Sequence, residues 1–300
     1  MLELSYYRLT FEAIQPIHSP GFQGSKWRSI LMRALYQAVC FNKQARHCSE
    51  CIAFNQCGYP YMFETPQTQG HDFLQRPHPY VVQTDHLAPC YYQVGDTVTL
   101  HLTLMGRAAN FLPFMLYGLN QVCLGKTQDN KANLQLKQAD ILDGSKWQRI
   151  WQGDELLTTI KQPDLNELPP KYLHLRFYSP LRIVANNQLL FDFQLPALMD
   201  ALIRRLRLIK QYYMQQTEQD GYDKAKQDVA LTTEPQLTWY DTQRFSKRQQ
   251  SKQPMGGLVG DVYLTVPDQT LRQALVVGQY LGVGKNTTMG LGQYQLINNE

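Results

Sequence analysis

The chain has 300 residues, is 43% hydrophobic and carries a formal net charge of +4. This length and composition suit one large domain or two of ordinary size, and the mild basic excess permits a nucleic-acid partner without identifying one. No window approaches the apolar length that spans a bilayer, and the alternating N-terminus lacks a basic region and a cleavage site. We therefore expect a soluble, cytoplasmic protein with no membrane partner, whose six cysteines are reduced or metal-bound.

The first half of the chain predicts the element order β-α-β-β-α-β. Alternation of apolar and polar residues predicts strands near 3–13, 78–84, 97–105, 134–142 and 147–152. Apolar residues at helical spacing predict helices over 26–39 and 108–124. Ser25 is placed to cap the first helix, and Pro113 to lie in the first turn of the second. The segment that follows the first helix, residues 40–63, is cysteine-rich and irregular.

The second half repeats this order after a polar, proline-containing stretch at 153–170, where we place a domain boundary. Strands are predicted near 171–183, 188–193, 236–243 and 257–266, and a last short one runs to Leu296. Helices are predicted over 196–216 and 268–281, with a polar stretch at 217–235 and Asp268 as the cap of the second helix. The doubled order predicts an α+β protein of tandem ferredoxin-like (RRM-like) domains. These are residues 1–152, with a Cys-rich insert at 40–66, and residues 171–300.

Glycines gather after the last predicted helix, where residues 282–292 read GVGKNTTMGLG. Glycine permits positive φ and close backbone approach, and a loop that exposes successive N–H groups beside a Lys and two Thr can hold phosphates. The nucleotide and dinucleotide signatures place their glycines before the helix, so this is neither of them. The residues expected to contact phosphates are Gly284, Lys285, Asn286, Thr287, Gly290 and Gly292.

Four cysteines have the spacing C-x7-C-x2-C-x5-C: Cys40, Cys48, Cys51 and Cys57. Four thiolates suit tetrahedral zinc, and a site filled by four protein ligands has a structural role because no position is open for catalysis. His47 could take the place of Cys40 as a ligand. The alternative is a set of reduced thiols in a small core.

A second cationic segment, residues 244–252, reads RFSKRQQSK, and Trp239, Tyr240 and Phe245 are interleaved with it. Cations for phosphates and aromatic rings for bases are the ingredients of a nucleic-acid surface, and the alternative is a solvated hairpin. The expected phosphate contacts here are Arg244, Lys247, Arg248 and Lys252. The cations of the 196–216 helix spread over more than one face, so an ordinary charged surface is as good an interpretation there. They are Arg204, Arg205, Arg207 and Lys210.

RNA can be cut without a metal if a base takes the 2′-hydroxyl proton, an acid protonates the leaving oxygen and cations hold the phosphorane. His18, in the loop before the first helix, is the candidate base, and Lys26 and Arg28 are the candidate charge stabilisers. Tyr36 and Lys285 are next in line as the base. The alternative for His18 is an ordinary loop histidine. His101 and His174 lie in predicted strands and are expected to be structural, whereas His71, His78 and His86 lie in loops and carry no signal.

Several blocks of the sequence resemble one known family. GQYLGVGKNTTMGLGQY, at the C-terminus, resembles the glycine-rich signature of RAMP-superfamily proteins, and the helix start at Gly24–Leu31 resembles the family's Gly-x-x-Leu-Arg-Gly, with Trp27 replacing the usual aliphatic residue. The blocks from Cys48 to Pro66 and from Trp239 to Gly260 resemble the Cys-rich block and second-domain strand of one branch. The chain is therefore similar to the CRISPR-associated endoribonucleases that process precursor CRISPR RNA.

The resemblance implies tandem ferredoxin-like domains and cleavage of repeat RNA with no catalytic metal, giving 5′-hydroxyl and 2′,3′-cyclic phosphate ends. It also implies an enzyme that can stay on its crRNA and join other CRISPR effector subunits. Two features depart from the family: Gly282 stands where many relatives carry a histidine, and the first helix lacks the histidine that several relatives use as base. The departures favour an alternative, a non-catalytic guide-RNA-binding subunit. A third hypothesis is a zinc-stabilised protein-interaction module without RNA affinity.

Overall fold

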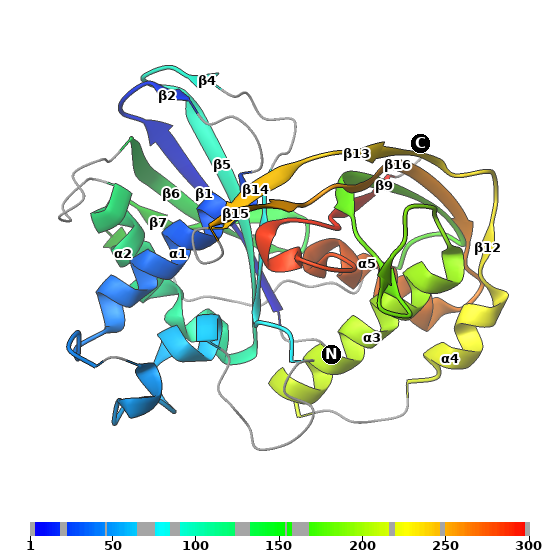
Figure 1. Cartoon of the computed structure of the whole chain (residues 1–300), viewed down its shortest axis with the longest axis horizontal. Coiled ribbons are helices and arrows are strands. Elements are labelled where there is room, and N and C mark those ends of the chain that lie inside the picture. Colours follow the sequence, from blue (N-terminus) through cyan, green and yellow to red (C-terminus); the bar gives the residue numbers. More distant parts are fainter. Residues whose placement is uncertain are drawn as a thin grey trace.

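The computed structural model describes residues 4–18, 23–45, 47–64, 76–84, 91–123, 133–153, 155–157, 168–215, 220–246 and 250–297. The described residues form two units of mixed helix and sheet that lie side by side, and each unit has an antiparallel sheet with helices packed on it (Figure 1). The sheets and helices follow the order expected from the sequence.

The N-terminal unit has a six-stranded sheet of order β3-β5-β1-β6-β7-β8. Its strands are β1 (Leu4–Ala13), β3 (Tyr80–Gln83), β5 (Thr97–Met105), β6 (Leu134–Asp143), β7 (Lys146–Gln152) and β8 (Glu155–Leu156). Its helices are α1 (Gly24–Val39) and α2 (Leu112–Cys123), with short turns η1 (Cys48–Glu50), η2 (Pro60–Glu64) and η4 (Gly106–Phe111). A separate two-stranded ribbon pairs β2 (Ile17–His18) with β4 (Tyr91–Tyr92). Strands β3, β5, β1 and β6 have the order of a ferredoxin-like unit, which confirms the expected fold class.

The C-terminal unit repeats this arrangement. Its main sheet joins β12 (Ala230–Leu231) and β13 (Gln236–Tyr240) to β16 (Gly257–Thr265), then β9 (Tyr172–Leu181), then β17 (Tyr294–Ile297). Two ribbons flank it: β10 (Val184–Ala185) with β11 (Gln188–Leu189), and β14 (Gln243–Ser246) with β15 (Ser251–Pro254). Its helices and helical turns are α3 (Leu195–Tyr213), α4 (Tyr222–Ala225), η5 (Lys226–Asp228), α5 (Gln269–Leu281) and η6 (Thr287–Met289). Among the described residues, no helix is long and apolar enough to cross a membrane.

Each core lies between one face of a sheet and its helices. Alternate residues of β1, including Leu9 and Phe11, are fully buried against Leu31 and Leu35 of α1, as period-two and helical spacing require. In the C-terminal unit, Leu175 and Phe177 of β9 pack in one cluster with residues of α3 and α5. Leu4, Val81 and Met105 of the N-terminal unit belong to that second cluster, so the two units share buried apolar surface.

Polar bonds fix α5 on the N-terminal sheet at this junction. The Thr103 hydroxyl donates to the Tyr280 carbonyl at 2.6 Å, and the ring of Tyr280 meets the ring of Tyr6 edge-on at 4.8 Å. The Gln83 amide of β3 donates to the Gln279 carbonyl at 2.8 Å. The end of α5, and the glycine-rich loop that begins there, are therefore held against β3.

The predicted elements differ from the structure at a few boundaries. Asp268 caps α5 as predicted, because its carboxylate accepts from the Leu271 N–H at 2.8 Å. Ser25 was the wrong cap for α1, which begins at Gly24 after Gln23 without a side-chain cap. The predicted 188–193 strand shrinks to β11, and the polar stretch 217–235 contains α4 and β12. The predicted 236–243 strand ends at Tyr240, and the chain then turns into the β14–β15 ribbon.

Candidate nucleic-acid site

The glycine-rich loop, residues 282–292, is fastened to the end of β9 by backbone bonds. The Lys285 N–H donates to the Arg182 carbonyl at 2.8 Å, and the Gly292 N–H donates to the Pro180 carbonyl at 2.9 Å. The loop also closes on itself, because the Val283 N–H donates to the Gly292 carbonyl at 2.8 Å. The loop is thus built around backbone-to-backbone packing.

Two of its glycines are required by that packing. Gly284 and Gly292 have φ values of +87° and +67°, which side-chain-bearing residues rarely adopt. A Cβ atom on Gly284 would lie 2.2 Å from the Arg182 carbonyl oxygen, and one on Gly292 would lie 1.8 Å from that of Val283. Because they lack a Cβ, Gly284 can lie against the backbone at Arg182, and Gly292 can lie against the backbone at Val283.

The same bonds limit what the loop can offer to a phosphate. The N–H groups of Lys285, Gly290 and Gly292 donate within the protein, so they are not the open row of donors that the sequence suggested. Thr287 is buried, whereas the side chains of Lys285 and Asn286 are exposed. The exposed side chains, rather than a row of backbone donors, are what the loop presents.

Three segments that are distant in sequence meet at η6, which contacts both α1 and β3. Arg28 of α1 donates from Nε to the Tyr80 hydroxyl at 2.8 Å. The Tyr80 side chain is fully buried, and its hydroxyl is also hydrogen-bonded to Thr288 of η6. Burial raises the pKa of Tyr80, so its hydroxyl stays protonated beside the Arg28 guanidinium. The predicted stabiliser Arg28 therefore lies against the glycine-rich loop.

His78 and Arg205 lie in the same neighbourhood as Arg28. The His78 and Tyr80 rings lie 5.7 Å apart between centroids. Burial lowers the pKa of His78 to about 4, and the positive charges of Arg28 and Arg205 lower it further, against a hydrogen bond to the Met62 backbone. Arg205 of α3 donates to the carbonyl of Leu281, the last residue of α5, at 3.0 Å. Burial lowers the pKa of Arg205 to about 10, and its Nη2 is buried without a hydrogen-bond partner among the described residues.

The other predicted catalytic residues are distributed differently. Lys26 is exposed in the first turn of α1, close to Arg28 in the chain. His18 lies in the β2–β4 ribbon, where its ring stacks on Tyr91 at 4.2 Å. Tyr36 lies farther along α1, with its ring edge-on to Tyr59 at 5.0 Å and a hydrogen bond to Cys40. The structure therefore groups Lys26 and Arg28, and places His18 and Tyr36 with other partners.

The basic β14–β15 ribbon adjoins the glycine-rich loop (Figure 1). Met255, directly after β15, is buried against Leu291 of the loop, and its sulfur lies 3.8 Å from the Asn286 amide nitrogen. Arg244 lies in β14 and the exposed Lys252 in β15. Lys247 and Arg248, also predicted to bind phosphate, lie outside the described residues. The glycine-rich loop and the β14–β15 ribbon, which the sequence predicts as two separate phosphate-binding segments, therefore lie next to each other.

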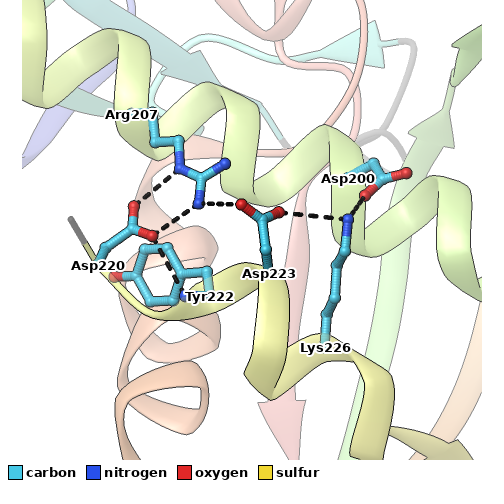
Figure 2. A network of polar contacts seen from close by, with 6 residues as sticks. All are labelled: Asp200, Arg207, Asp220, Tyr222, Asp223 and Lys226. Carbon is cyan, nitrogen blue, oxygen red and sulfur yellow. Dashed lines mark hydrogen bonds and ion pairs between the residues drawn. The ribbon is translucent and has the colours of Figure 1, made fainter.

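The cations of α3 have separate environments. Arg207 donates to both carboxylate oxygens of Asp220, at 2.9 and 2.7 Å, and to Asp223 at 2.9 Å. Lys226 joins Asp223 to Asp200, so the network ties α4 and η5 to α3 (Figure 2). Arg207 holds the pKa of the Asp220 carboxyl below its usual range. Arg207 therefore serves the fold, whereas Arg205, only two residues earlier, faces the loop cluster.

Two family models together account for nearly the whole chain. Residues 2–165 match the N-terminal domain family AF_1859_N, and residues 175–294 match the CRISPR-associated endoribonuclease Cas6. Residues 175–294 therefore form a Cas6 domain. An uncharacterized protein of Archaeoglobus fulgidus is 23% identical to it over 286 residues, which are 93% of each chain.

Solved Cas6 structures share the fold. A Cas6 product complex superposes with a TM-score of 0.60 at 12% identity, covering 99% of this chain and 100% of the other. Thermus thermophilus Cas6 superposes with a TM-score of 0.55 at 13% identity, covering 99% of each chain. A partial Cas6-RT-Cas1–Cas2 complex gives a TM-score of 0.59 at 13% identity, and this chain spans 46% of that one. In the other such complex it spans 29% of the matched chain.

Four of the six cysteines gather around one pocket. Cys40, Cys48, Cys51 and Cys57 line it together, with Tyr36 and Tyr59 among its other walls. All four are free thiols, and burial raises the pKa of Cys48 to about 12. Within the described residues, no three Cys, His, Asp or Glu groups come close enough to hold a metal ion. Zinc binding stays a prediction, and it would require the thiols to draw together into the pocket they share.

We expect protein purified without a chelator to carry about one equivalent of zinc, because a closed four-thiolate site binds zinc tightly. Elemental analysis measures this directly. A Cys51→Ser variant should lose the metal, and a Cys123→Ser variant, which changes a cysteine distant from this cluster in sequence, should keep it. A zinc content below about half an equivalent in the unmodified protein would instead support four reduced thiols.

Proposed function

We propose that this chain is an endoribonuclease that cleaves CRISPR repeat RNA in precursor transcripts to give mature guide RNA. The observation that carries the proposal is the Cas6 family match over residues 175–294, whose glycine-rich loop meets the cationic start of α1. Its fold is that of solved Cas6 proteins. Enzymes of this kind act on a phosphodiester, and the cations beside the loop are suited to that charge.

The chemistry needs no metal ion. The ribose 2′-oxygen attacks the adjacent phosphorus, and cations placed around the phosphorane stabilise its extra negative charge. Arg28, held by Tyr80, and Lys26, exposed in the same helix turn, supply that charge, with Lys285 on the loop. The products are a 2′,3′-cyclic phosphate and a 5′-hydroxyl, and no water is consumed in the step.

The β14–β15 ribbon and the glycine-rich loop form the RNA-binding surface in this proposal. Arg244, Lys252 and Lys285 contact phosphates, and Trp239 and Tyr240 are each more than a third exposed and can stack on bases. The product crRNA stays bound, and other CRISPR effector subunits assemble on it. This last step rests on the family alone.

Replacing Arg244 or Lys285 with alanine should weaken binding of repeat RNA and flatten its salt dependence. Each lost phosphate contact releases roughly one counterion fewer, so the slope of log K against log salt should fall by about 0.7–0.9 per variant. Fluorescence anisotropy at several salt concentrations measures the slope. Lys224→Ala, which removes an exposed cation of α4, is the matched control and should leave the slope unchanged. Unchanged slopes in both test variants would remove these residues from the RNA surface.

The proposal as a whole is tested by incubating the purified protein with its cognate repeat RNA in EDTA, then separating the products on a denaturing gel and the complexes on a native gel. Cleavage at one site within the repeat supports it. A mobility shift without cleavage supports the non-catalytic guide-RNA-binding subunit instead. If the RNA is neither cleaved nor shifted, only the protein-interaction module remains among the three hypotheses.

A further inference from the structure

We infer that His78 is the general base that takes the 2′-hydroxyl proton of the RNA. The inference rests on the proposed function and names a residue of the same site. His78 lies two residues before the start of β3, and its position beside Tyr80, its hydrogen bond and its charged neighbours each favour this role.

The first argument is position. Arg28 reaches Thr288 of the glycine-rich loop through the Tyr80 hydroxyl, and Arg205 bonds the carbonyl of Leu281, where that loop begins. His78 lies within the electrostatic influence of both arginines, and its ring is 5.7 Å from that of Tyr80. His78 therefore lies beside the tyrosine through which Arg28 reaches the loop.

The second argument is the hydrogen bond of the ring. One ring nitrogen of His78 is bonded to the backbone of Met62, and this bond favours the protonated ring, so that nitrogen donates. A neutral imidazole that donates from one nitrogen presents the other as an acceptor. Pro77 and Pro79 flank His78 and restrict its backbone, and the Tyr213 hydroxyl donates to the Pro77 carbonyl. The ring nitrogen that would accept the proton therefore belongs to a residue whose backbone is restricted by its two proline neighbours.

The third argument is charge. The groups that act on His78 are Arg28 from α1, Arg205 from α3 and the Met62 backbone, and no carboxylate is among the causes of its shift. Burial and the two arginines keep the free imidazole neutral at physiological pH, which is the form that accepts a proton. A bound phosphodiester brings negative charge, which raises the pKa of the ring and makes it a stronger base. The same arginines can then face the phosphorane.

The proposed cleavage step transfers one proton and exchanges one P–O bond for another. The 2′-O–H proton passes to the free ring nitrogen of His78 while the 2′-oxygen bonds to phosphorus, and the P–O5′ bond breaks with its electron pair on the 5′-oxygen. Water gives that oxygen a proton, and the hydroxide so formed takes the proton from the imidazolium. The enzyme returns to its starting form.

His18 is the base that the sequence nominates, and its surroundings differ. It stacks on Tyr91 in a two-residue ribbon, whereas His78 adjoins the Arg28–Tyr80–Thr288 chain. The position of His78 beside the Arg28–Tyr80–Thr288 chain therefore favours it over His18 as the general base.

Single-turnover cleavage of cognate repeat RNA in EDTA distinguishes the two. His78→Gln can still donate to the Met62 carbonyl but cannot act as a base, so it should fold like the unmodified protein, bind RNA with nearly unchanged affinity and cleave roughly 10²–10⁴-fold more slowly. His78→Ala should lose as much rate and regain part of it when imidazole is added. His18→Ala tests the competing assignment: cleavage at near the unmodified rate supports His78 as the base, and a loss as large as that of His78→Gln supports His18 and overturns the inference.

The dependence of the cleavage rate on pH also tests the role of His78 as a base, because a purely structural role of this residue would leave that dependence unchanged. The kcat/KM of the unmodified protein should fall as pH drops through the free-enzyme pKa of His78, about 4. The acid limb of single-turnover cleavage at saturating RNA should lie at higher pH, and His78→Gln should lack it. Near-normal cleavage by folded His78→Gln overturns the inference alone. Absence of cleavage by the unmodified protein overturns the proposed function, and this inference with it.

Discussion

Replacing Arg28 with alanine is expected to lower the single-turnover rate of repeat-RNA cleavage by about 10²–10³-fold, the usual cost of removing one donor that faces a developing negative charge. Arg28 is fixed by its 2.8 Å bond to a fully buried tyrosine, so its guanidinium is oriented before RNA binds. Because the charge on the phosphorane exceeds that of the ground-state phosphate, the loss should appear mainly in the cleavage rate rather than in affinity.

Rapid-quench assays at saturating RNA measure this rate. Arg28→Lys keeps the charge but not the planar donor geometry, so it should recover only part of the activity. Arg33→Ala, which removes an exposed cation farther along α1, is the control and should cleave normally. A rate for Arg28→Ala within about threefold of the unmodified protein would contradict the role, since a typical donor deletion costs at least 10².

Gly292→Ala is expected to destabilise the protein by about 2–5 kcal/mol, which combines left-handed backbone strain with steric overlap. The new Cβ would lie 1.8 Å from the Val283 carbonyl oxygen at a φ of +67°. Gly144→Ala is a matched control, because Gly144 has a φ of +60° but nothing within 4 Å of the added Cβ. It should cost only about 1–2 kcal/mol, from backbone strain alone.

Urea denaturation of both variants and the unmodified protein measures these differences. The loop is bonded to the end of β9, and its η6 segment contacts α1 and β3. Gly292→Ala should therefore also weaken RNA binding, whereas Gly144→Ala should not. Equal destabilisation by the two substitutions would mean that Gly292 is needed for its backbone angle only, and not for close packing.

The ferredoxin-like order of both units could be predicted from sequence because their long strands and helices carry strong periodic signals. Elements β2, β4, β10 and β12 are only two residues long, which is too short for alternation to mark a strand. Ser25 looked like a cap because of its residue type. The helix begins two residues earlier than predicted, at Gly24, a buried glycine.

The site was only partly predictable, for a physical reason. Lys26 and Arg28 could be nominated from the sequence because they are cations at the start of a predicted helix, where an anionic phosphate is favoured. His78 sits between two prolines, where the sequence carries no functional signal, and its significance arises from Arg28 and Arg205, which are 50 and 127 residues away in the chain. The loop N–H groups were a less reliable guide, because the sequence could not show that the carbonyls of Pro180, Arg182 and Thr287 accept three of them.

The most direct test of the account uses a repeat RNA with a single 2′-deoxy nucleotide at the scissile position, incubated with the protein in EDTA beside the unmodified RNA. Without the 2′-oxygen there is no nucleophile and no proton for a base to take. The account predicts that the deoxy RNA binds with the same affinity and stays intact while the unmodified RNA is cut to a 2′,3′-cyclic phosphate. Equal cleavage of the two RNAs would contradict it.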